Sequence, residues 1–75
     1  MATIGERVLE VVRKQPGVSD AAIARELGIR HQQANAEAHH LENQALIVRR
    51  GGAAEDGSIG NFPAKPKTKA AGDGS

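Results

Sequence analysis

Amide and imidazole side chains dominate the segment RHQQANAEAHH at residues 30–40. Residues 31–44 contain no lysine or arginine, although this stretch is flanked by Arg30, Arg49 and Arg50. Glutamine and asparagine amides can pair bidentately with the N6 and N7 positions of adenine, and arginine can pair with guanine or with phosphate. These residue types favour recognition of bases by hydrogen bonds, with the attraction of phosphate left to the flanking arginines.

Catalytic and metal chemistry find little support in the sequence. The histidines stand at positions 31, 39 and 40, which is not the i, i+4 pair of a helical zinc site, and the absence of cysteine excludes Cys-based zinc sites. No nucleophile stands in a pattern with a base, and no glycine loop is followed by a phosphate-binding lysine. We therefore predict no enzymatic activity, no metal and no other cofactor. A pH-sensing role of the histidines stays open, because this residue type changes charge near neutral pH.

Length and charge narrow the choice of partner. The 75 residues suffice for one small domain, and residues 1–62 carry seven basic against eight acidic side chains. Any nucleic-acid binding must therefore depend on local clustering of charge. Phe62 is the single aromatic residue, which argues against a single-strand binder that stacks bases. No apolar run could span a membrane and the lack of cysteine fits a reducing cytoplasm, so we predict a cytoplasmic protein.

The first helix is predicted from its cap and its apolar face. Thr3 and Glu6 form a capping-box pattern, in which each side chain can bond the main chain of the other residue. Apolar residues then recur on one helical face, at Ile4, Val8, Val11 and Val12. Pro16 interrupts the pattern. The helix should span residues 4–15.

Two further helices follow, joined by a glycine turn. Ser19 is a good N-cap and Gly28 a good C-terminal glycine, so a two-turn helix is predicted at 20–27. A longer helix is predicted at 31–44. Its start is poorly capped, because Arg30 occupies the place where serine or threonine would serve better.

A β-hairpin and a polar tail complete the chain. The β-branched run at 46–50 predicts a strand, and the loop at 51–57 contains the turn-forming pair Asp-Gly. A returning strand is predicted at 58–62, with Ile59 as its apolar residue. Residues 63–75 are rich in lysine, proline and glycine and are expected to form a disordered basic tail or linker.

Two segments of the chain carry a helix-turn-helix pattern, AIARELGI at 22–29 and LENQALIVRR at 41–50. The small residue, the turn glycine and the next core positions of this pattern fall on Ala24, Gly28, Ile29 and Ala34. On these residues the chain resembles the winged helix-turn-helix of bacterial MarR-like regulators over residues 3–62. The passage from Leu41 into the hairpin is similar to the family's LE-x-x-GLI motif, with Ala45 in place of glycine.

The resemblance implies a mainly α fold with a small β-hairpin, a winged helix-turn-helix of three helices plus wing. Residues 1–62 would form this domain. In the third helix we expect Ala34, Ala38 and Leu41 to face inward, with Glu37 at the border of that face. The small alanines predict close packing of this helix on its neighbours.

The function implied is sequence-specific binding of double-stranded DNA, by a transcriptional regulator or a DNA-targeting module located at the nucleoid. The helix at 31–44 would enter the major groove, and the wing at 46–62 would contact the flanking backbone. The expected contact residues combine base readers with phosphate-binding cations. They are Arg30, His31, Gln32, Gln33, Asn35, His39, Arg49 and Arg50.

The near-neutral charge leaves the mode of action open. A monomer should bind DNA weakly, so a homodimer on two half-sites or a place in a larger protein assembly would strengthen binding. The alternative function is that of a winged-helix adaptor, which binds other proteins without contacting DNA.

Overall fold

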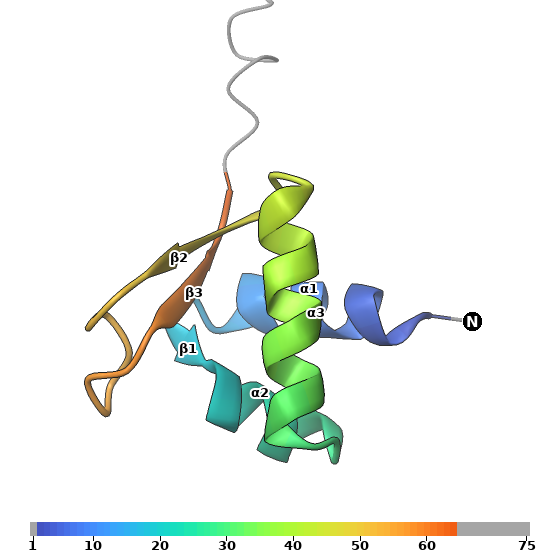
Figure 1. Cartoon of the computed structure of the whole chain (residues 1–75), viewed down its shortest axis with the longest axis horizontal. Helices are drawn as coiled ribbons and strands as arrows, with labels where there is room; N and C mark the ends of the chain where they lie inside the picture. Colours follow the sequence, from blue (N-terminus) through green and yellow to red (C-terminus); the bar gives the residue numbers. More distant parts are fainter. Residues whose placement is uncertain (1, 65–75) are drawn as a thin grey trace, which may run out of the picture.

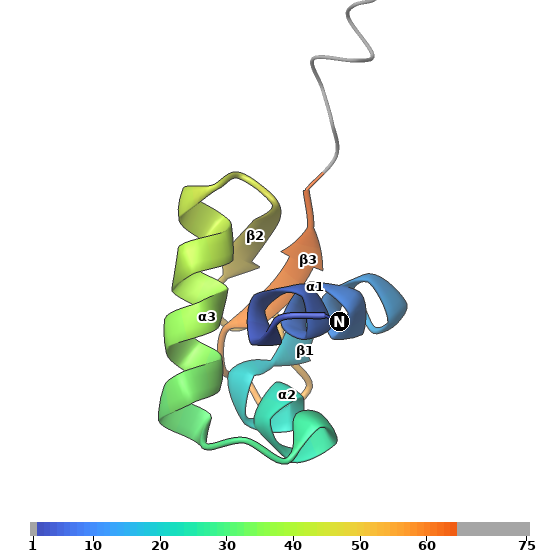
Figure 2. The same cartoon turned by 90° about the vertical axis from the view of Figure 1, so that its right-hand side faces the viewer.

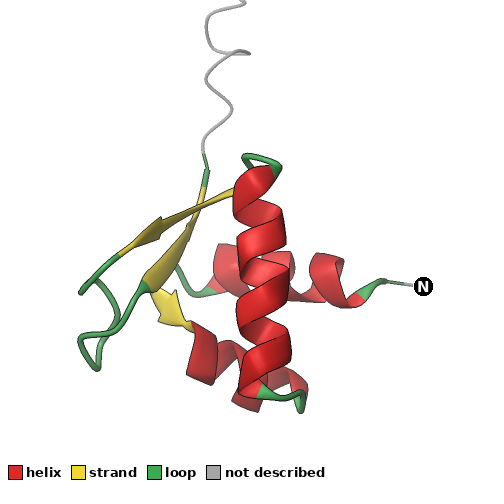
Figure 3. Cartoon of the chain, in the orientation of Figure 1, coloured by secondary structure: helices red, strands yellow, loops and turns green. Residues whose placement is uncertain are grey.

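The computed structural model describes residues 2–64, within which three helices and three strands follow one another (Figure 1, Figure 3). The elements are α1 Ile4–Lys14, β1 Val18–Ser19, α2 Asp20–Leu27, α3 His31–Asn43, β2 Ile47–Arg50 and β3 Gly60–Pro63. This is a small mixed α/β domain compatible with a winged-helix arrangement. None of these helices is long and apolar enough to cross a membrane. From residue 65 onward, the predicted tail lies outside the described residues.

The helix boundaries follow from the predicted caps. The hydroxyl of Thr3 accepts the N–H of Glu6 at 3.1 Å while the Glu6 carboxylate accepts the N–H of Thr3 at 3.0 Å, which completes the capping box. The Ser19 hydroxyl caps α2 by accepting the N–H of Ala22 at 3.1 Å. Gly28 ends α2 in the left-handed conformation, with φ of 69°. As predicted, α3 starts without a side-chain cap.

The core lies between the three helices and the inner face of the sheet. It contains Val8, Val11 and Val12 from α1, Ile23 and Ala24 from α2, Ala34, Ala38 and Leu41 from α3, and Val18 and Ile47 from the strands. Ala34 and Ala38 are fully buried, so α3 packs through small side chains as expected. Figure 2 shows α3 as the outermost element along one side of the molecule.

Glu37 occupies the border of the inward face of α3, as its helical position predicts, and is half-buried. A Cβ placed on Gly5 would lie 3.3 Å from Oε1 of Glu37, so this carboxylate approaches the first turn of α1. A negative charge is favourable at that end of a helix because the helix dipole is positive there.

The sheet differs from the predicted hairpin by one strand. Its order is β1-β3-β2, and β3 pairs antiparallel with both neighbours. The main chain at Val18 pairs with Asn61, and the N–H of Gly17 donates to the carbonyl of Asn61 at 2.8 Å. The hydrophobic pattern could not reveal β1, because a strand of two residues has no periodicity to recognise.

The returning strand begins at Gly60 and not at residue 58, and Ile59 is 41% exposed. The preceding loop closes on itself, since the N–H of Ala54 donates to the carbonyl of Ser58 at 3.1 Å. Ala54 is buried in consequence. A Cβ on Gly60 would lie 3.0 Å from main-chain atoms of Ala54 and Gly17, so the close approach of three chain segments requires glycine there.

The connection from α3 to β2 is strained at Ala45, a residue other than glycine with φ of 62°. The left-handed conformation costs an L-residue about 1–2 kcal/mol, because Cβ approaches the neighbouring carbonyl. We expect Ala45→Gly to raise the free energy of unfolding by about 0.5–1 kcal/mol, part of the relief being offset by the greater chain entropy of glycine.

Urea denaturation measures this change. Ala53→Gly in the exposed part of the wing loop is the matched control, because Ala53 does not have a positive φ and should be weakened slightly by glycine. A loss of stability in both variants would contradict the strain at Ala45.

Candidate nucleic-acid interface

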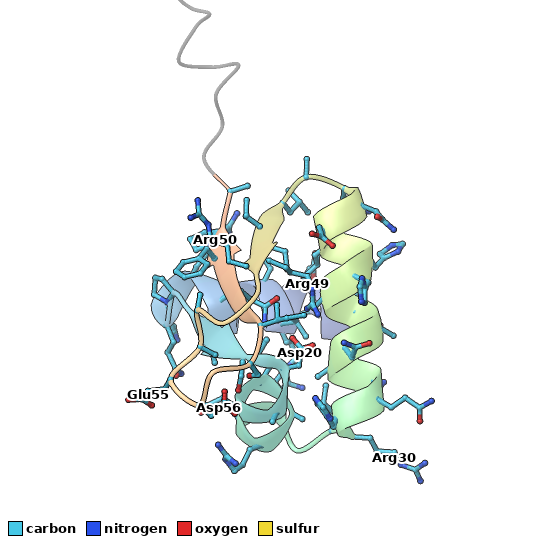
Figure 4. All side chains as sticks on the ribbon, turned by 60° about the vertical axis from the view of Figure 1, so that its left-hand side comes forward. Asp20, Arg30, Arg49, Arg50, Glu55 and Asp56 are labelled. Carbon is cyan, nitrogen blue, oxygen red and sulfur yellow. The ribbon has the colours of Figure 1, made fainter. Side chains whose placement is uncertain are left out.

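Most of the predicted contact residues lie on the exposed outer side of α3. Arg30, at its N-cap position, points away from the domain in Figure 4. His31, Gln32, Gln33 and His39 are likewise exposed. These residues lie between the N-terminal end of α3 and its third turn.

The structure corrects the predicted exposure of Arg49. Its side chain is only 4% exposed and turns inward from β2 toward Asp20 (Figure 4). The guanidinium donates to both oxygens of that carboxylate, with Nη1 2.9 Å from Oδ1 and Nη2 3.0 Å from Oδ2. Arg49 was expected to contact phosphate, but both terminal nitrogens of its guanidinium donate to Asp20 instead.

Asn35 is corrected in the same way. Its Nδ2 donates to Oδ2 of Asp20 at 2.8 Å, and the residue is half-buried. A turn of about 100° per residue places Asn35 on the outward half of α3. Because it directly follows the buried Ala34, it lies close to the edge of the inward face, and its side chain turns toward α2. One N–H of its amide is therefore engaged with the carboxylate of Asp20 in α2.

Asn61 completes this buried group of polar side chains. It is fully buried, and its Nδ2 donates to Oδ1 of Asp20 at 2.8 Å and to the carbonyl of Val18 at 2.9 Å. Its Oδ1 accepts Nη1 of Arg49 at 2.9 Å. The four side chains Asp20, Asn35, Arg49 and Asn61, here called the polar clamp, join α2, α3, β2 and β3.

By itself, the sequence shows Asp20 only as a carboxylate at the positive end of the α2 dipole, and Asn61 belongs to no motif. One signal was present in the sequence, because asparagine is depleted in strands and a strand asparagine needs partners when buried. The identity of those partners depends on contacts between residues as far apart as Asp20 and Asn61, 41 positions, which no local pattern contains.

The carboxylate of Asp20 is held ionised by this environment. Burial by itself raises the pKa of Asp20. Hydrogen bonds from Arg49, Asn35 and Asn61, together with the charge of Arg49, lower it by more, so that the pKa lies below the usual 3.8. A carboxyl group whose pKa is lower in the folded state stabilises the fold above its unfolded pKa, and this stabilisation is lost as the pH falls through the folded pKa.

We therefore expect the stability difference between the wild type and Asp20→Asn to be largest above about pH 4 and to shrink at lower pH. Thermal unfolding between about pH 2 and pH 7 would show this convergence. Glu10→Gln serves as the control, because Glu10 is exposed and its contact with Lys14, at 3.7 Å, is exposed as well. A constant difference at every pH would contradict the role assigned to the Asp20 charge.

The wing loop, residues 51–59, carries negative charge near its tip. Glu55 and Asp56 are exposed there (Figure 4). Oδ1 of Asp56 accepts the hydroxyl of Ser58 at 2.6 Å and its N–H at 3.0 Å, and these bonds hold the pKa of Asp56 below its usual value. Arg50 is exposed at the base of the loop, with its guanidinium carbon 6.0 Å from the centre of the Phe62 ring. The positive charge of the wing is thus at its base and the negative charge at its tip.

In the part of the chain that the structure describes, the three histidines all lie on α3. Nδ1 of His39 lies 3.8 Å from Oε1 of Glu42, which is an exposed contact. Within residues 2–64, no three side chains of metal-ligating type come together. His31 and His40 are exposed on the same helix.

Comparison with known proteins adds no assignment to this geometry. No protein-family model matches the chain, and no curated protein matches it.

Proposed function

We propose that this protein binds double-stranded DNA in a sequence-specific manner, as a transcriptional regulator or a DNA-targeting module, with α3 in the major groove. The observation that carries the proposal is the exposed N-terminal part of α3. Arg30, His31, Gln32 and Gln33 follow one another there, and residues 30–36 contain no carboxylate that would repel DNA. Recognition helices contact base edges mainly with this end.

The start of α3 also offers main-chain donors. Arg30 provides no side-chain cap, so the N–H groups of the first turn have no side-chain acceptor from that position. Such N–H groups and the positive end of the helix dipole favour a phosphate. The charged side chain of Arg30 lies beside them and adds to this attraction.

The distribution of charge limits what the wing can contribute. Arg49 is neutralised by Asp20, and Glu55 and Asp56 disfavour contact of the loop tip with phosphate. We therefore assign the wing's phosphate contact to Arg50 at its base. With Arg30 and Arg50 as the principal cations, the logarithm of affinity should fall with the logarithm of salt concentration with a slope of about −2.

Titration of isotope-labelled protein with duplex DNA tests the proposal. Between about 50 and 200 mM salt the affinity should fall roughly tenfold, and amide shifts should centre on residues 30–39 and on Arg50. A slope much steeper than about −2 would implicate the lysines beyond residue 64. Shifts confined to other surfaces, or their absence at low salt, would refute DNA binding through α3.

A protein-interaction adaptor is the alternative, and the wing favours it. Leu46, Val48 and Ile59, in and next to the wing strands, are each about 40% exposed. Exposed large apolar side chains are available for contact with another protein. Under this alternative, DNA would produce no shifts in α3, and substitutions at Val48 would weaken binding of a protein partner.

A further inference from the structure

Small side chains make the contact of α3 with the core smooth before its last turn. Ala34 and Ala38 are fully buried in this part of the helix, and Leu41 provides the large inward side chain only in the last turn. Alanine has a single methyl group, so an alanine surface has shallow ridges that resist rotation of a helix about its axis poorly. Gln32 and Gln33 are exposed on this part of α3. A contact other than the alanine packing must therefore set the rotation of the helix about its axis.

Asn35 of the polar clamp is in the right place to provide it. Its amide lies on the second turn of α3, beside Ala34, and reaches Oδ2 of Asp20 at 2.8 Å. That carboxylate is itself immobilised, because Arg49 contacts both oxygens and Asn61 contacts Oδ1 at 2.8 Å. Hydrogen bonds weaken steeply when their angles change. The bond from Asn35 to Asp20 therefore depends on the rotation of α3, whereas the packing of the alanine methyl groups depends on it little.

We propose that Asn35 is a positioning residue, which sets the rotation of α3 relative to the wing through the carboxylate of Asp20 and the guanidinium of Arg49. A rotation of about 20° moves a side-chain atom about 6 Å from the helix axis by about 2 Å. This displacement exceeds the tolerance of a hydrogen bond, so a rotated helix would misplace Gln32 and Gln33 for base contacts. The effect on base contacts by Gln32 and Gln33 rests on the proposed function. The role of Asn35 in setting the rotation of α3 does not depend on DNA binding.

The orientation of α3 can be measured without DNA. The chain contains no cysteine, so spin labels attach only at Ala36→Cys on the exposed side of α3 and at Val48→Cys on β2. The distance distribution between them should be narrow with Asn35 in place. With Asn35→Ala it should broaden or shift by about 2 Å, as the rotation argument requires.

Ile23→Val is the control for general loosening, because Ile23 is fully buried in the same core and is not part of the polar clamp. Both variants are compared under conditions where their free energies of unfolding are equal. An unchanged distribution in Asn35→Ala, or equal broadening in Ile23→Val, would overturn the positioning role. Asn35→Ser provides a second variant with a shorter side chain and should broaden the distribution as well.

A second measurement concerns the reading of DNA. Duplexes selected from a random pool supply a preferred sequence, and its affinity is compared with that for an unrelated duplex. Asn35→Ala should reduce this ratio by about tenfold, the loss of one good base contact, with little change in binding to the unrelated duplex. A reduced ratio in Ile23→Val, or an unchanged one in Asn35→Ala, would overturn this consequence. If the wild type binds no duplex, the proposed function fails while the distance measurement still decides the positioning.

Discussion

Arg49→Met should lower the free energy of unfolding by about 3–5 kcal/mol, because it leaves the carboxylate of Asp20 buried without its charged partner. Domains of this size have a total stability of about 4–11 kcal/mol, so this loss would be at least about a quarter of the total. The methionine replaces the aliphatic part of the arginine, so that the loss reports the charge and its hydrogen bonds more than the packing. Urea denaturation followed by circular dichroism measures the effect.

Two further variants separate this effect from general damage to β2. Arg50→Met changes the exposed neighbour and should cost at most about 1 kcal/mol, the size of an exposed cation–π contact with Phe62. Asp20→Asn combined with Arg49→Met removes both charges and should be more stable than Arg49→Met alone. Equal losses in Arg49→Met and Arg50→Met would show that the buried ion pair is not what holds β2.

Gln32→Ala combined with Gln33→Ala should reduce affinity for a preferred duplex by about thirtyfold or more. Each bidentate contact between an amide and a base contributes about 1–3 kcal/mol, and both side chains are exposed at the N-terminal end of α3. Stability should change by less than about 0.5 kcal/mol, because neither side chain is buried. Fluorescence anisotropy with labelled duplexes measures the affinity, and binding to an unrelated duplex should change little.

Asn43→Ala is the matched control for this prediction. Asn43 is also an exposed amide on α3, but it lies at the C-terminal end of the helix, which the proposed docking places away from the bases. Its replacement should leave the affinity unchanged. If Asn43→Ala weakened binding as much as the double variant, the proposed docking of α3 would be wrong.

Local signals predicted the helices within about one residue, for reasons that the structure makes plain. The caps at Thr3 and Ser19 and the glycine at position 28 act on neighbouring main-chain atoms, so their effect is contained in a few consecutive residues. The same holds for the exposure of Gln32 and Gln33, which follows from the helical step once Ala34 is inward.

The sheet and the polar clamp were less predictable. The strand β1 exists because Val18 meets Asn61, and β3 starts late because the wing loop closes through Ala54. Arg49 and Arg50 are identical neighbours in the sequence, yet one is buried and the other exposed. Alternation along a strand predicts that the two arginines face opposite sides of the sheet. It does not show that the carboxylate of Asp20 lies next to Arg49 on the inner side.

The sequence by itself therefore determined the order of elements, the three helices, the alanine face of α3 and the row of exposed amides at its start. These features depend on interactions within one turn or a few residues, which the sequence contains directly. Only the tertiary structure decided that Asn35 and Arg49 face Asp20, and that a two-residue strand joins the hairpin. Burial of a charge depends on partners brought together from distant positions, and their combined geometry exists only once the chain is folded.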